Sequence, residues 1–420
     1  MGFKRSRVRI PAPRPPRIRP RFMCAGGLLT GAKVKGEDGM RAQRRILLLY
    51  MSFSPGSGHY QAAQALEKAF GQLYPQVQTM TIDFFVFIPP MLKKAIVKVY
   101  FEMVRLTPRV YRYLWQSDRR KKSARIRSVI NRLSSERFKE FLQDFGPEAV
   151  VCTQAFPCGA LSTLKKREKI GIPLVAVGTD FDMHLYWLYE EVDLYVVATD
   201  FARAKLLKKG VEQEKIKLIG IPIDPVFNQR KDELSLKEKL GLDLKMPTLL
   251  VMGGSRGLGS TEDIIRSLDD ISLPFQVIVV AGINKPLRER LNFLSGELSR
   301  PLHVVGYVDN IDEMMEVADL LITKPGGLTS TEALAKGLPL IIIDPLPGQE
   351  ELNARYLIER GIAMRANNPE EVGKAASNLL TDWTRLGERS LRARKLASAD
   401  ASMDIVRSVM DLVAQSQRAA

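Results

Sequence analysis

Three segments of the chain place glycine residues beside side chains that could bind anions or move protons. The first, "PGSGHYQ" at residues 55–61, follows an apolar run and puts His59 in the first turn of a predicted helix. A glycine-rich turn before a helix leaves backbone N–H groups free, and the helix dipole favours an anion there. The same dipole lowers the pKa of an imidazole, which then stays neutral and basic. The alternative is a tight turn whose glycines serve close packing alone.

The second segment, "MGGSRGLGS" at residues 252–260, repeats this strand, turn and helix arrangement. It lacks the acidic residue after the next strand that a dinucleotide site needs, and it lacks the Gly-Lys-Ser/Thr of a P-loop. The third segment, "KPGGLTSTEALAKG" at residues 324–337, predicts a helix capped by Thr329 or Ser330 with Glu332 in its first turn. A capping box, in which Glu332 folds back on the cap, is the alternative for this segment.

A fourth polar cluster, "GQEELN" at residues 348–353, opens the next predicted helix. Gln349, Glu350 and Asn353 are therefore expected beside the third segment. Amide and carboxylate pairs of this kind suit a ligand rich in hydroxyl groups.

The elements that would position these residues alternate along the chain as apolar strands and amphipathic helices. Strands are predicted at residues 45–51, 77–82, 149–153, 173–178, 193–199 and 215–220, and again at 248–254, 275–282, 302–307, 319–324 and 339–344. Continuous apolar strands separated by helices predict parallel sheets covered on both faces. We therefore expect an α/β fold with two doubly wound, Rossmann-like domains facing a cleft, with ligands at the carboxyl ends of the strands.

Composition narrows the possible functions. The chain has 420 residues, of which 45% are hydrophobic and 26% charged, as in ordinary globular proteins. Three cysteines without CxxC spacing suggest neither a disulfide framework nor a zinc site and fit a reducing cytoplasm. No apolar run reaches the ~20 residues that span a bilayer.

The net charge of +16 is concentrated in two segments. Residues 1–45 hold 13 Lys and Arg against 2 Asp and Glu, and residues 93–139 hold 15 against 3. We interpret residues 1–44, rich in Arg and Pro, as a disordered and non-functional tail. A polyanion-binding arm and a translation start at Met40 are the alternatives. The rest of the chain is mildly acidic, so no nucleic-acid partner is expected.

The second basic segment contains a predicted amphipathic helix over residues 90–106. Its apolar stripe is flanked by Lys93, Lys94, Lys98 and Arg105, and Trp115 follows among further cations. Basic amphipathic helices lie in the interface of anionic membranes. We predict that residues 84–127 dock on an anionic membrane surface. A core helix with a solvated basic face is the alternative.

Taken together, "PGSGHYQAAQAL", "GTDFDMHLYWLYEEVDLYVVATD", "MGGSRGLG" and "KPGGLTSTEALAKGLPLIIIDPLPGQEELNA" resemble the glycosyltransferases that make glycosyl-diacylglycerols. These are the processive diacylglycerol glucosyltransferases and the monogalactosyldiacylglycerol synthases, and they are similar to the N-acetylglucosaminyltransferase of the peptidoglycan precursor. The resemblance covers about residues 45–385. It implies the GT-B fold, with an acceptor and membrane-binding domain at 45–227, a UDP-sugar-binding domain at 246–385 and a C-terminal helix at 386–420 that packs back.

The resemblance also implies roles for individual residues. Glu332 should bind the ribose and the backbone at Val308 the uracil, while Gln349 and Glu350 should recognise the hexose. The diphosphate should lie against the positions Gly56, Gly58, Gly254, Ser255, Thr329 and Ser330. His59 matches a residue proposed either to touch the diphosphate or to take the acceptor proton, and Asp83 matches an aspartate that competes for the role of base.

The implied reaction is an inverting transfer of a hexose from a UDP-sugar to diacylglycerol at the cytoplasmic face of the membrane. No metal-binding DxD sequence is placed in the expected cleft, so we expect no catalytic metal and no cofactor. A UDP-sugar 2-epimerase, a transferase to another lipid acceptor and a polyanion-binding protein are the alternatives.

Overall fold

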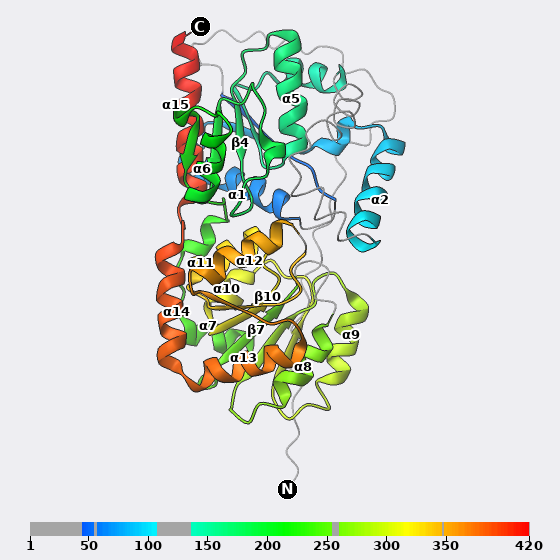
Figure 1. Cartoon of the computed structure of the whole chain (residues 1–420), viewed down its shortest axis with the longest axis vertical. Coiled ribbons are helices and arrows are strands. Elements are labelled where there is room, and N and C mark those ends of the chain that lie inside the picture. The colour runs from blue at the N-terminus through cyan, green and yellow to red at the C-terminus, as the bar shows by residue number, and fades with distance from the viewer. Residues whose placement is uncertain (1–43, 54–56, 107–135, 254–259, 347, 420) are drawn as a thin grey trace. The chain divides into compact units, whose positions relative to one another are not determined.

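The computed structural model describes residues 44–53, 57–106, 136–253, 260–346 and 348–419 (Figure 1). The side chains of residues 100, 101, 103–106 and 419 lie outside this description. Within the described residues the chain forms two parallel six-stranded sheets with helices on both faces. The predicted α/β class with two Rossmann-like domains is confirmed.

The first sheet has the strand order β2-β1-β3-β4-β5-β6. Its strands are β1 (Arg45–Tyr50), β2 (Gln78–Asp83), β3 (Ala149–Cys152), β4 (Leu174–Val177), β5 (Leu194–Val197) and β6 (Ile216–Leu218). The chain reverses direction across the sheet between β1 and β3, which lie side by side in parallel. Such a switch point is where ligands bind in doubly wound sheets.

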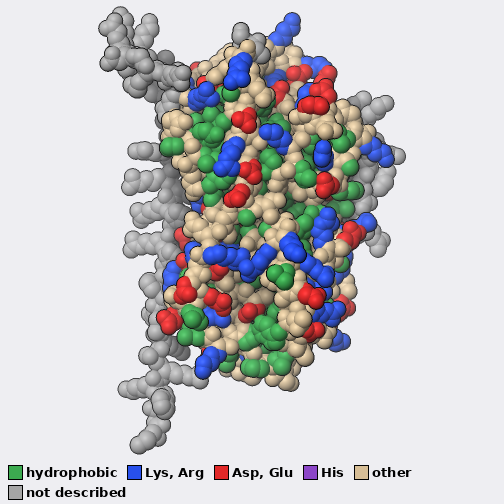
Figure 2. All heavy atoms as spheres, turned by 90° about the vertical axis from the view of Figure 1, so that its left-hand side faces the viewer, with side chains coloured by type: hydrophobic (Ala, Val, Ile, Leu, Met, Phe, Trp, Pro, Cys, Tyr) green, Lys and Arg blue, Asp and Glu red, His purple; other side chains and the backbone are tan. Residues whose placement is uncertain are grey.

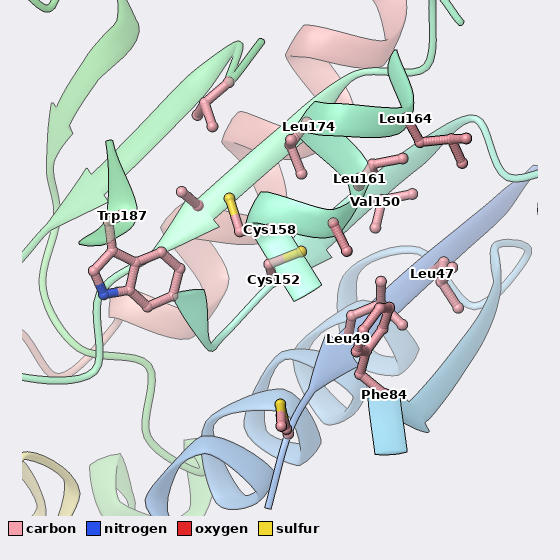
Figure 3. Close-up of a cluster of buried hydrophobic side chains, with 14 of the residues drawn as sticks. Leu47, Leu49, Phe84, Val150, Cys152, Cys158, Leu161, Leu164, Leu174 and Trp187 are labelled. Atoms are coloured by element: carbon pink, nitrogen blue, oxygen red, sulfur yellow. The ribbon is translucent and has the colours of Figure 1, made fainter. Parts of the chain in front are cut away.

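Helices and 3-10 turns connect these strands. They are α1 (Gly58–Leu73), η1 (Phe84–Phe87), α2 (Pro90–Leu106), α5 (Ala155–Glu168), η2 (Leu185–Trp187), α6 (Asp200–Lys208), η3 (Gln213–Lys215) and η4 (Pro225–Asn228). Because side chains alternate along a strand, Leu47 and Leu49 face a core that also holds Leu161 of α5 and Phe84 of η1 (Figure 3). Leu48 faces the opposite core, under α1.

The second sheet has the order β12-β11-β10-β7-β8-β9. Its strands are β7 (Thr248–Met252), β8 (Gln276–Val280), β9 (Leu302–Val305), β10 (Leu320–Thr323), β11 (Leu340–Ile342) and β12 (Ala363–Arg365). The switch point here lies between β7 and β10, which pair in parallel. All eleven predicted strands are present. Strand β12 was not predicted, because three residues, "AMR", are too short a run to show a period.

The helices of the second domain are α7 (Glu233–Leu240), α8 (Thr261–Asp269), α9 (Lys285–Leu294), α10 (Ile311–Glu316), α11 (Gly327–Lys336), α12 (Gln349–Glu359), α13 (Pro369–Thr381) and α14 (Trp383–Leu396). One face of the sheet packs with α11 and α12, and the other with α8, α9 and α13. Figure 1 shows this layered arrangement around β7 and β10.

The last helix, α15 (Ala401–Ala419), packs against the first domain. Its side chains Ile405, Val406 and Val409 are fully buried with Leu48 and Phe70 in the core under α1. The Ser402 hydroxyl donates to the Ile223 carbonyl at 2.5 Å. The C-terminal helix therefore ties the end of the chain to the first sheet.

Among the described residues, none of the helices is both long enough and apolar enough to cross a bilayer.

Candidate active site

His59 lies at the switch point of the first sheet. Its Nδ1 atom is 2.8 Å from the carbonyl oxygen of Thr153, the residue that follows β3, and 3.1 Å from the hydroxyl of Thr179 after β4. The Thr153 hydroxyl in turn donates to the His59 carbonyl at 2.8 Å. The segments that follow β1, β3 and β4 therefore together fix the position of the imidazole.

These contacts determine the chemistry of the ring. A carbonyl oxygen only accepts, so Nδ1 must carry the proton and Nε2 is left with a lone pair. Burial lowers the pKa of His59 to about 4, although the hydrogen bond to Thr153 acts in the opposite direction. The ring is therefore neutral at pH 7, with Nε2 as its proton acceptor.

Asp83, the other candidate base, ends the edge strand β2 on the far side of β1. Its carboxylate accepts from the Phe85 amide at 3.0 Å and caps η1. Burial raises the pKa of Asp83, and the Phe85 bond and the nearby Lys93 partly offset this rise. None of the described contacts joins Asp83 to His59, whose ring is held on the β3 and β4 side.

The two domains meet at the carboxyl ends of their sheets. A Cβ atom on Gly58 would lie 3.1 Å from the side chain of Leu328 on α11. A Cβ on Gly327 would lie only 1.9 Å from the carbonyl oxygen of Thr179. Only glycine fits at position 327, because the first turn of α11 packs directly on the segment that holds His59.

The start of α11 corrects one prediction. Neither Thr329 nor Ser330 caps this helix: it begins at Gly327, with Gly326 as the N-cap residue. The glycine pair lets the chain turn into the helix while it is pressed against Thr179, so the helix starts earlier than the hydroxyl residues suggested. Glu332 is consequently the sixth residue of α11, and a capping box cannot form.

Each of the helices α1 and α11 has one buried hydroxyl group near its N-terminus without a described hydrogen-bond partner. Ser330 is fully buried, and its hydroxyl has no hydrogen-bond partner in the described part of the chain. The same holds for the buried hydroxyl of Ser57, the N-cap of α1. Neither helix carries an acidic residue in its first turn. Both helix N-termini are therefore suited to an anion.

Glu332 is partly buried beside the N-cap of η4. Burial raises its pKa to about 7, and the charge of Asp224 adds to the rise. Asp224 itself is paired with Lys68 of α1. Glu332 makes no hydrogen bond to the described residues, so its carboxyl group is free to bind hydroxyls.

Helix α12 begins with Gln349 and Glu350, after Gly348 with φ of 106°. Both side chains are partly buried. Glu350 accepts from the Leu346 amide at 2.7 Å, so one of its oxygens holds the preceding loop. Burial raises the pKa of Glu350, and Lys324 lowers it in part. Val308 lies after β9, partly buried against the core of the second domain.

Asn353 lies beside the third segment, as expected, and it also contacts the other domain. Its amide nitrogen donates to Asp180 at 2.9 Å and to the Pro325 carbonyl at 3.1 Å, and its oxygen accepts from the Phe181 amide at 3.0 Å. Burial raises the pKa of Asp180 to about 6, the Asn353 bond opposes this, and Glu350 and Asp182 add to the rise.

The basic helix α2 has the bounds that its sequence predicted. Its expected apolar stripe is divided, however. Leu92 and Ile96 of this stripe pack against the core of the first domain, whereas Val99 is 57% exposed. Outside the stripe, Val97 packs against the same core and Met91 is 87% exposed. Lys93, Lys94 and Lys98 are exposed along the same helix. The outer face of α2 therefore combines cations with exposed apolar side chains.

Some predicted site residues lie outside the described residues, namely Gly56, Trp115, Gly254 and Ser255. Arg105 belongs to α2, but its side chain is not described. Among the described residues no group of three or more His, Cys, Asp or Glu side chains could hold a metal ion.

Sequence reasoning missed Thr153 and Thr179, which fix His59. Both follow buried strands, so the rule that singled out the other strand ends could have found them. Nothing in the sequence indicated the three bonds of Asn353. Two of them join residues more than 170 positions apart, and only the contact between the domains creates those two.

Two parallel sheets that meet at their carboxyl ends, with anion-suited helix N-termini at the junction, define a GT-B type glycosyltransferase fold. Solved structures agree on the fold. MurG of Acinetobacter baumannii matches with a TM-score of 0.60 at 15% identity, over 88% of this chain and 99% of that one. The UDP co-structure of Staphylococcus aureus MnaA matches with a TM-score of 0.57 at 17% identity, over 86% and 95%.

Comparison with related sequences identifies the family as well as the fold. Residues 59–223 match the family model of monogalactosyldiacylglycerol (MGDG) synthase, and residues 248–405 match the glycosyltransferase family 28 C-terminal domain. The processive diacylglycerol beta-glucosyltransferase of Bacillus subtilis (strain 168) is 32% identical over 88% of this chain and 96% of its own length. That of Bacillus cereus (strain G9842) is 34% identical over 81% and 87%. The chain therefore belongs to the diacylglycerol glycosyltransferase family.

Proposed function

We propose that this protein transfers a hexose from a UDP-sugar to the hydroxyl of diacylglycerol with inversion at the anomeric carbon. The observation that carries the proposal is the fixed His59 ring at the junction of the two domains, in a chain that aligns with nearly the full length of a diacylglycerol glucosyltransferase. A base placed between an acceptor domain and a donor domain is what this reaction requires.

In the proposed step, Nε2 of His59 takes the proton of the acceptor hydroxyl. The acceptor oxygen forms a bond to the anomeric carbon, and the bond between that carbon and the phosphate oxygen breaks on the opposite face, releasing UDP. Holding the imidazole through Nδ1 keeps its basic atom in one orientation, which reduces the entropic cost of reaching the transition state.

The second domain is the proposed donor site. Glu332 accepts hydrogen bonds from the ribose, the backbone at Val308 binds the uracil, and Gln349 with Glu350 binds the hexose. The N-termini of α1 and α11, with the hydroxyls of Ser57 and Ser330, suit the diphosphate, whose negative charge grows as the bond breaks. We propose that these groups neutralise the leaving group without a metal ion or cofactor, so that a chelator leaves the rate unchanged.

The outer face of α2 is the proposed membrane contact. Exposed Met91 and Val99 can enter the headgroup layer, while Lys94 and Lys98 on the same face attract anionic lipid. Lys93 is also exposed, but its ammonium group lies 4.9 Å from the centre of the Phe85 ring, so it adds to the local charge from the side of the core. We place this contact at the cytoplasmic face of the membrane. Figure 2 shows another face of the molecule, which carries both acidic and basic side chains, with a row of Lys and Arg side chains across its middle.

The decisive experiment measures UDP release by purified protein from UDP-glucose and from UDP-galactose, each with and without diacylglycerol in detergent micelles. Release that depends on the lipid, with hexosyl-diacylglycerol as product, is expected. Turnover that proceeds equally without lipid would refute the proposal and favour a 2-epimerase or a transferase to a soluble acceptor.

A further inference from the structure

Among the described residues, one side chain of α12 makes two hydrogen bonds to the first domain. Asn353 is fully buried, and both its amide nitrogen and its amide oxygen form hydrogen bonds. It donates to the Asp180 carboxylate and to the Pro325 carbonyl of its own domain, and it accepts from the Phe181 amide. A buried amide with three hydrogen bonds has a single orientation, because any rotation would leave a polar group unpaired.

The segment that Asn353 binds is the one that touches His59. Thr179 precedes Asp180, and its hydroxyl lies 3.1 Å from His59 Nδ1. The carbonyl of Thr179 also meets the backbone of Gly327, and the Phe181 carbonyl accepts from the Thr199 hydroxyl at 2.7 Å. The 179–181 segment is therefore held on one side by its own domain and on the other by the second domain.

Asn353 lies one helical turn after Gln349 and Glu350 on α12. A movement of this helix that accompanies binding of a sugar would therefore move Asn353 as well. The chain of contacts runs from α12 through Asn353 to the 179–181 segment and from Thr179 to the imidazole. Each link is a hydrogen-bonding contact or a peptide bond, so the path is continuous.

We propose that Asn353 is a positioning residue. Its hydrogen bonds from α12 fix the 179–181 segment, and Thr179 of that segment holds the ring of His59 in the orientation that the reaction needs. The inference rests on the proposed function, in which α12 binds the hexose and His59 is the base. It adds a coupling between hexose binding by α12 and the orientation of His59. The imidazole has its reactive orientation only when the donor domain contacts the acceptor domain. Asn353 itself need not touch either substrate.

Kinetics of three variants test this role. Asn353→Ala should lower kcat by about 10–100-fold while the Kd for UDP and the KM for UDP-hexose change less than about twofold, since a misplaced base costs rate and not binding. Thr179→Val, which loses the hydroxyl near His59, should also lower kcat. The double variant should be no slower, within about threefold, than the slower single variant, because both changes break one path.

Two control variants separate positioning from general packing between the domains. Tyr356→Leu removes a ring that stacks on the Phe181 ring, with 4.7 Å between the ring centroids, but leaves the hydrogen bonds of Asn353 in place. Arg355→Ala changes an exposed neighbour on α12 that pairs with Glu359. Both should keep kcat within about threefold of the parent. If Asn353→Ala does not fold, as judged by its thermal transition, Asn353→Ser replaces it under the same criteria.

A measurement without turnover makes the inference independent of the reaction. The chain has only three histidines, so their ring nitrogens can be followed by 15N NMR. Asn353→Ala should shift or broaden the His59 signals and leave those of the distant His303 unchanged, whereas Arg355→Ala should change neither. The proposal would be overturned if the His59 signals of Asn353→Ala were unchanged, or if Asn353→Ala raised the KM for UDP-hexose without lowering kcat. It would also be overturned if the losses of kcat were additive in the double variant, or if Tyr356→Leu lowered kcat as much as Asn353→Ala does. Failure of the proposed function would appear separately, as UDP release by the parent without lipid dependence.

Discussion

The Nδ1 atom of His59 lies 2.8 Å from the backbone oxygen of Thr153, a residue 94 positions further along the chain. This bond joins the two strand ends that flank the switch point of the first sheet. Because the oxygen belongs to the backbone, substitution of Thr153 cannot remove it. The tautomer of His59 is therefore a property of the fold and does not depend on the identity of the side chain at position 153.

His59→Ala should lower kcat by about two to four orders of magnitude if the imidazole is the general base. With a pKa of about 4, the ring of the free enzyme is neutral above about pH 5, so its own titration should leave kcat/KM flat between pH 6 and 8. The measurement is steady-state turnover over this range. A loss that saturating UDP-hexose restores would assign His59 to diphosphate binding instead.

Glu332→Ala should weaken UDP binding by roughly 1.5–3 kcal/mol, the value of one charge-assisted hydrogen bond or bidentate pair. Isothermal titration calorimetry with UDP measures this directly, and the thermal transition of the variant verifies that it folds. Unchanged affinity in a folded variant would contradict the ribose assignment.

Glu332→Gln should change the pH dependence of stability. In the folded chain Glu332 keeps its proton up to about pH 7, whereas an unfolded glutamate releases it near its ordinary value of 4.5. Between these values the folded state binds more protons, so the parent loses stability as pH rises and the amide variant does not. We expect the variant to melt about 2 °C above the parent at pH 8 and at nearly the same temperature at pH 4.5.

The control for this melting experiment is Glu238→Gln, at an exposed position on α7. Its melting temperature should differ from that of the parent by the same small amount at both pH values. A difference between the parent and Glu332→Gln that does not vary with pH would show that Glu332 titrates normally.

Gln349→Ala should leave UDP affinity nearly unchanged while the discrimination between UDP-glucose and UDP-galactose decreases. A side chain that contacts only the hexose contributes to the difference in kcat/KM between the two donors and not to the binding of UDP. Glu350 is less suitable for this test, because its carboxylate also holds the Leu346 amide. An equal loss for UDP and for both sugars would argue against a hexose-specific role.

Replacing Lys93, Lys94 and Lys98 by Ser should weaken binding to anionic liposomes by on the order of 100-fold, at ~1 kcal/mol per cation. Co-sedimentation at low salt measures the effect, and binding of the parent should itself decrease as salt rises. Serine at the exposed positions Lys245, Lys285 and Lys374 makes the same change in net charge on the second domain. If both triple variants lose binding equally, α2 is not the docking face.

The sequence by itself determined the elements and the class of the fold. Apolar runs identified eleven of the twelve strands, the spacing of residues 90–106 predicted α2 with its bounds, and the glycine turn before His59 indicated a ligand site. These features depend on interactions between residues close in the chain, which local periodicity and turn chemistry report. The short strand β12 was missed because it has no such pattern.

Only the tertiary structure decided which polar groups meet. Thr153 and Thr179 reach His59 because β1, β3 and β4 are neighbours in the sheet, and Asn353 reaches Asp180 because the two domains touch. The same contact moved the start of α11 to Gly327, since only a residue without Cβ fits against Thr179. Packing against the first core likewise divided the apolar stripe of α2. Such contacts join residues far apart in the chain, so the order of strands and the docking of domains specify them, and local sequence does not.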